Sequence, residues 1–85
     1  MKTEFHEKYE LRTLSFHMNL KRIRIERGLT QEELADLAGI SVSYLSRLES
    51  RKGDKMPSDY TLCWLAHCLH VGPEDLTRID EVLLK

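Results

Sequence analysis

The stretch from residue 41 to residue 49, SVSYLSRLE, could place small polar groups and one arginine on a single helix face. If Leu45 and Leu48 point inward, the opposite face carries Val42, Ser43, Ser46 and Arg47. An arginine on an open face can make a bidentate contact to guanine, serine can hydrogen-bond base edges, and valine can meet a thymine methyl group. The pattern therefore predicts that these four residues read DNA bases in the major groove.

Gln31 stands at the expected start of the preceding helix. Exposed backbone N–H groups and the positive end of a helix both suit a phosphate, and a glutamine amide adds one more donor. Taken alone, Gln31 is better explained as a residue that merely favours helix, and only the surrounding pattern favours the phosphate contact.

A helix, a short turn and a second helix must position these side chains. Thr30 followed by Glu33 forms a capping box, which predicts a helix from about residue 30 to residue 38. Gly39 can adopt a left-handed conformation that ends this helix, and Ser41 can cap the next one, over residues 41–50. The expected buried side of the first helix consists of Leu34, Ala35, Leu37 and Ala38.

Three further helices are expected, and no segment shows strand alternation, so the predicted fold class is all-α. A helix over residues 15–27 has the apolar stripe Phe16, Leu20 and Ile23, and Gly28 ends it. Pro57 opens a fourth helix, with Ser58 or Asp59 near its start. The apolar side of this helix is Leu62, Cys63, Leu65, Ala66 and Leu69. A last helix follows Pro73 and carries Leu76, Ile79, Val82 and Leu83. Residues 1–14 form an N-terminal extension, either a short helix or a flexible arm, and residues 15–85 form the domain.

Net charge is −1 for the 85 residues, but the charges are unevenly distributed. Residues 21–55 contain eight Lys or Arg and six Asp or Glu, a balance of +2, whereas residues 56–85 contain two and five, a balance of −3. A local basic surface is enough for phosphate contact, although ordinary charge scatter on a solvated face explains the pattern equally well. No apolar run is long enough to span a bilayer, and the polar opening segment is unlike a signal peptide, so we expect no membrane association and a cytoplasmic protein.

The two cysteines, Cys63 and Cys68, are five residues apart, too far for a disulfide within one helix, and are predicted to be small buried hydrophobic residues. Cys63, His67 and His70 raise the possibility of a metal site, but no second ligand cluster accompanies them. We expect neither a metal nor a cofactor. The chain also has no Ser/His/Asp arrangement and no phosphate-binding loop, so we expect no enzymatic activity.

Residues 16–76 resemble the Cro/CI-type (XRE-like) helix-turn-helix family of DNA-binding regulators. The resemblance lies in LKRIRIERGLTQEELADLAGISVSYLSRLE and in PSDYTLCWLAHCLHVGPEDL. It implies a compact five-helix, lambda-repressor-like DNA-binding domain. The family's position for Gln31 contacts a DNA phosphate and braces the recognition helix, and Ser41 and Tyr44 match positions near the DNA backbone. Arg24 and Glu49 match a structural ion pair, and the basic loop adds the expected phosphate contacts Arg51, Lys52 and Lys55.

Together these features predict a sequence-specific, double-stranded DNA-binding transcriptional regulator that binds a palindromic operator as a homodimer. The expected dimer interface comprises Trp64, Ile79, Val82, Leu83 and Leu84. The alternative is a protein–protein interaction module of the same fold that does not read DNA, which the acidic C-terminal third favours. The sequence does not indicate an effector molecule.

Overall fold

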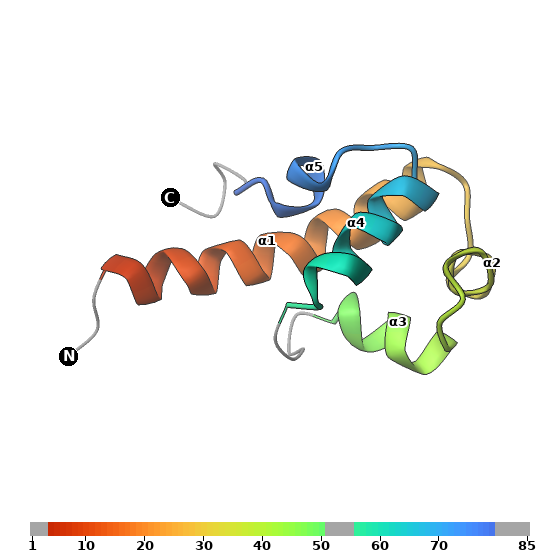
Figure 1. The fold of residues 1–85 in the computed structure, drawn as a ribbon, viewed down its shortest axis with the longest axis horizontal. Helices are drawn as coiled ribbons and strands as arrows, with labels where there is room; N and C mark the ends of the chain where they lie inside the picture. The colour runs from red at the N-terminus through yellow and green to blue at the C-terminus, as the bar shows by residue number, and fades with distance from the viewer. Residues whose placement is uncertain (1–3, 51–55, 80–85) are drawn as a thin grey trace.

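The computed structural model contains five α-helices and, over the residues it describes, no β-strand (Figure 1). The structure describes the backbone of residues 4–50 and 56–79 and the side chains of residues 12–50 and 56–79. The helices are α1 (Glu4–Glu26), α2 (Gln31–Ala38), α3 (Val42–Leu48), α4 (Asp59–Cys68) and α5 (Pro73–Thr77). The all-α, five-helix prediction is therefore confirmed, and no helix of the described part is long and apolar enough to cross a membrane.

Helix α1 begins earlier than the sequence predicted, at Glu4 rather than near Ser15. Residues 4–14 form neither a separate short helix nor an arm, because they continue the same helix. The physical reason is that no glycine or proline occurs before Gly28, so nothing interrupts the helix. Figure 1 shows the N-terminal part of α1 extending past the other four helices.

The core lies where α1 passes the other helices. The predicted stripe of Phe16, Leu20 and Ile23 is buried, and Leu45 and Leu48 of α3 point inward as expected. One prediction for α2 is wrong, because 55% of Leu37 is exposed. The buried side of this short helix is instead Leu34, Ala35 and Ala38. At 100° per residue Leu37 falls well outside the arc that these three residues share.

The caps between α1 and α3 agree with the sequence prediction. The Thr30 hydroxyl accepts a hydrogen bond of 3.0 Å from the backbone N–H of Glu33, whose carboxylate accepts one of 2.9 Å from the backbone N–H of Thr30. Gly39 has φ +68°, and its N–H donates to carbonyl oxygens of α2. Because α2 ends in this left-handed residue, the chain can turn at once into α3.

Helix α4 differs from the prediction at its start and on its surface. Ser58 is the N-cap, so Pro57 precedes the helix rather than opening it. Both cysteines were expected to be buried, yet Cys63 is exposed and Cys68 is only partly buried. The buried stripe follows the helical period through Leu62, Leu65, Ala66 and Leu69, and both cysteines lie to the side of that stripe.

The last helix is shorter than expected, because α5 ends at Thr77 and Arg78 is already extended. The side-chain amide of Asn19 donates hydrogen bonds of 3.1 Å to the Leu76 carbonyl and 2.9 Å to the Arg78 carbonyl, which attaches this end of the chain to α1. Ile79 is partly buried beyond the helix. The remaining predicted interface residues, Val82, Leu83 and Leu84, and the predicted phosphate contacts Arg51, Lys52 and Lys55 lie outside the described residues.

Candidate nucleic-acid interface

Helix α3 presents the predicted base-reading residues together. Ser41 is its N-cap, with the hydroxyl accepting a 3.0 Å hydrogen bond from the backbone N–H of Tyr44. Burial of Leu45 and Leu48 fixes the rotation of the helix. The open face consists of Val42, Ser43, Ser46 and Arg47, all exposed. The arrangement can offer hydrogen-bond donors and acceptors and one apolar group to the edges of base pairs.

A buried ion pair holds the C-terminal end of α3 against α1. Arg24 Nε lies 2.7 Å from Glu49 Oε2, and Arg24 Nη2 lies 3.1 Å from Glu49 Oε1. The third guanidinium nitrogen, Nη1, donates a 2.7 Å hydrogen bond to the Leu29 carbonyl. Both side chains are almost inaccessible to solvent, so this pair positions α3 and is not available to a ligand.

Gln31 contacts the same carboxylate from the first turn of α2. Its amide nitrogen donates a 3.0 Å hydrogen bond to Glu49 Oε1. The side chain is half-buried, between the start of α2 and the end of α3. The structure therefore gives Gln31 a bracing position. Gln31 also lies at the start of α2, the position at which the sequence predicted a phosphate contact.

Sequence reasoning missed a second attachment of α3. His17, buried in α1, donates a hydrogen bond from Nδ1 to the Leu48 carbonyl oxygen, and its ring packs edge-on against Phe16. The contact satisfies a carbonyl at the end of α3 that has no partner within the helix. The sequence offered only a weak signal, a histidine next to the apolar stripe.

Sequence reasoning also missed that α4 supports the turn between α2 and α3. The indole nitrogen of Trp64 donates a 3.1 Å hydrogen bond to the Ala38 carbonyl, and the ring of His67 stacks on the indole with a centroid separation of 5.3 Å. The Cys68 thiol lies 3.7 Å from the Leu37 carbonyl oxygen, and partial burial raises the pKa of this thiol. Trp64 remains 42% exposed, so part of its ring is accessible.

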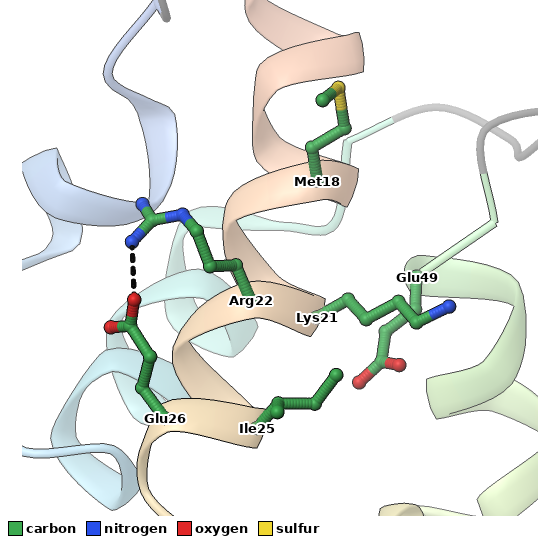
Figure 2. A pocket seen from close by; sticks show the side chains of 6 residues that line it. All are labelled: Met18, Lys21, Arg22, Ile25, Glu26 and Glu49. Carbon is green, nitrogen blue, oxygen red and sulfur yellow. Dashed lines mark hydrogen bonds and ion pairs between the residues drawn. The ribbon is translucent and has the colours of Figure 1, made fainter.

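A groove lies on the outer side of α1, away from the base-reading residues. Its volume is about 430 Å³, and it is lined by Met18, Lys21, Arg22, Ile25, Glu26 and Glu49. Figure 2 shows Glu49 reaching this groove from the α3 side and Arg22 paired with Glu26 at 3.1 Å on the other. None of the four exposed α3 residues lines it. The described residues also include no group of three or more His, Cys, Asp or Glu placed to hold a metal ion.

Helix α2, the short turn at Gly39 and the exposed helix α3 together form a helix-turn-helix unit, which defines the class of this domain. A profile of the helix-turn-helix family matches residues 20–76, which is more than half of the chain. The chain belongs to this family, in its Cro/CI-type (XRE-like) branch, and is a DNA-binding transcriptional regulator.

One known regulator is similar to this chain in sequence, and two solved structures are similar to it in fold. The chain is 45% identical over 64 residues to an uncharacterized helix-turn-helix-type transcriptional regulator, y4dJ, of Sinorhizobium fredii, covering 74% of this chain and 80% of that protein. It is similar in structure to the restriction-modification controller protein C.AhdI from Aeromonas hydrophila, with a TM-score of 0.68, 31% identity, and coverage of 75% of this chain and 94% of the controller. The clp gene regulator ClgR from C. glutamicum is also similar, with a TM-score of 0.67, 32% identity, and coverage of 78% and 82%.

Proposed function

We propose that this regulator reads a specific double-stranded operator by placing α3 in the major groove. The observation that carries the proposal is the burial of Leu45 and Leu48, which leaves one open face on α3. In the proposal that face reads bases through Val42, Ser43, Ser46 and Arg47. Phosphate contacts come from Gln31, Ser41 and Tyr44 at the starts of α2 and α3, and from Arg51, Lys52 and Lys55 beyond the described residues.

We further propose that the regulator binds a palindromic operator as a homodimer. A two-fold dimer would place two copies of α3 in successive major grooves, about 34–36 Å apart, which is one turn of B-DNA. The proposed interface combines Trp64 and Ile79 with Val82, Leu83 and Leu84. The accessible part of the Trp64 indole supports this, because exposed tryptophans are frequent anchors of interfaces.

Selection of preferred duplexes from a random pool by the purified chain tests both proposals. We expect one enriched sequence with two inverted half-sites. Affinity for this duplex should fall steeply with salt, because neutralised phosphates release counterions. A pool that emerges without any sequence preference would contradict base reading, and an enriched site without inverted symmetry would contradict the two-fold dimer.

The Arg47→Ala variant, measured on the selected duplex, tests whether Arg47 reads a base. We expect a loss of about 1–3 kcal/mol on the selected duplex and relaxed discrimination at one base pair. Arg22→Ala is the matched control, because it removes the same charge from an exposed position on α1 that does not belong to the α3 face. If Arg47→Ala keeps the full preference, Arg47 does not read a base.

A second candidate function is a protein–protein module of the same fold. The acidic balance of −3 over residues 56–85 favours it, because this third of the chain would repel DNA. Complete absence of duplex binding at low salt would support this candidate over the operator-binding proposal.

A further inference from the structure

The side chains of Tyr44 and Arg47 are in contact on α3. Arg47 Cζ lies 5.9 Å from the centroid of the Tyr44 ring, within the range of about 6 Å for a cation–π interaction. The two residues are three positions apart, so one turn of helix brings them together. The tyrosine is partly buried and packs against the hydrophobic core, whereas the arginine is exposed. The ring is thus a surface held by the core beside an exposed charged side chain.

We propose that Tyr44 is a positioning residue for base recognition, and that its ring orients Arg47 toward one base pair. This inference rests on the proposed function, in which Arg47 reads that base pair. A guanidinium group is planar, with its N–H donors in the plane and its π face perpendicular to them. A guanidinium group whose face lies over a tyrosine ring has its N–H edge directed away from that ring, in an orientation from which it can donate two hydrogen bonds to guanine O6 and N7.

Such a contact would improve discrimination because it orders Arg47 before DNA arrives. A long arginine side chain otherwise loses rotamer freedom when it is held against a base, which weakens binding. The tyrosine ring is already held by the core, and the backbone N–H of Tyr44 is bonded to the Ser41 hydroxyl. Because Tyr44 is already ordered, its contact with Arg47 costs little additional conformational entropy of the tyrosine side chain.

The ring and the phenolic hydroxyl give Tyr44 two separable roles. The phosphate contact proposed above needs only the hydroxyl, which acts alike on every sequence. The positioning role needs only the aromatic face, and it affects recognition only at the base pair that Arg47 reads. Tyr44→Phe removes the hydroxyl and keeps the ring, whereas Tyr44→Leu removes the ring and keeps an apolar side chain.

The experiment measures affinity of the full chain for the selected duplex and for the three duplexes that change the base pair read by Arg47. Tyr44→Phe should retain the discrimination among the four. Tyr44→Leu should reduce it by about two- to five-fold, the range expected for an exposed cation–π contact. In an Arg47→Ala or an Arg47→Lys background, Tyr44→Leu should leave the discrimination unchanged, since no planar guanidinium remains to be oriented.

Two outcomes would overturn the inference. The first is that Tyr44→Leu weakens all four duplexes equally in the wild-type background as well as in the Arg47 variants, which would make Tyr44 a structural or phosphate-contacting residue only. The second is that Tyr44→Leu strengthens discrimination, which would mean that the contact competes with DNA. If the wild-type chain prefers no duplex, the proposed function itself fails and this inference fails with it.

A measurement on the wild-type protein covers the case in which Tyr44→Leu does not fold. In the nuclear magnetic resonance spectrum of the DNA complex, the side-chain protons nearest to Arg47 Cζ should show an upfield ring-current shift, because Cζ lies over the Tyr44 ring. The Tyr44→Phe complex should show the same shift. Loss of the shift on DNA binding would show that the ring does not support the arginine in the complex.

Discussion

Arg24 and Glu49 form a two-point ion pair, 2.7 Å and 3.1 Å long, between the last turn of α1 and the residue that follows α3. Gln31 donates a hydrogen bond to the same carboxylate from the first turn of α2. One buried carboxylate therefore connects three helices at the end of α3, the helix that carries the proposed DNA-reading face. The orientation of α3 depends on this group as well as on the packing of its leucines.

Glu49→Gln should strongly destabilise the domain. The substitution leaves the Arg24 charge buried without its partner, and breaking a buried pair in this way costs about 3–5 kcal/mol. Chemical denaturation followed by circular dichroism measures the effect. Glu26→Gln is the matched control, because it breaks the exposed Arg22–Glu26 pair and should change stability by less than about 1 kcal/mol. Equal effects of the two substitutions would show that burial does not strengthen the Arg24–Glu49 pair.

Gly39→Ala should destabilise the domain by about 1–2 kcal/mol through backbone conformation alone. Gly39 has φ +68°, and no atom lies within 4 Å of the position that a Cβ would take, so steric overlap does not contribute. Gly39→Asn should cost less, because asparagine tolerates the left-handed conformation. Thermal denaturation of the two variants gives the comparison, and an alanine variant as stable as wild type would contradict the left-handed turn.

Trp64→Phe should lower the free energy of unfolding by about 1 kcal/mol, because the Ala38 carbonyl loses its indole donor. This loss is intramolecular, so it should be the same at every protein concentration. A role of Trp64 in the proposed dimer would add a loss that is largest at high protein concentration and disappears on dilution, because only associated subunits are stabilised by the interface. Denaturation curves at several protein concentrations separate the two contributions.

Iodoacetamide should modify Cys63 before Cys68. Burial raises the pKa of the Cys68 thiol, so at a given pH less of it is the reactive thiolate. Cys63 is exposed on α4. Raising the pH should increase the rate at Cys68, because its thiolate fraction then rises. Mass spectrometry of peptides over a time course measures both rates, with Cys63→Ser identifying the slower site. Faster labelling of Cys68 would contradict the position of this thiol beneath Leu37.

The parts of the structure that the sequence predicted well are the local ones. The capping box of Thr30 and Glu33, the left-handed Gly39 and the Ser41 cap each involve residues at most four positions apart. The buried stripe of α1 likewise follows from the period of one helix. Leu37 and Cys63 were assigned wrongly because several rotations of a short apolar helix bury similar numbers of apolar groups, and only the neighbouring helices select one.

The amino-acid sequence by itself determined the helical class, the turn before α3 and the residues on the open face of that helix, because caps, glycine conformation and helical period act within a few residues. No local pattern decided how α3 is held: the family resemblance implied the Arg24–Glu49 pair and the bracing by Gln31, and only the tertiary structure showed the contacts of His17 and Trp64. His17 with Leu48, Arg24 with Glu49, Gln31 with Glu49 and Trp64 with Ala38 join residues 31, 25, 18 and 26 positions apart. No local preference encodes such pairs, because each partner finds the other only after the helices have packed.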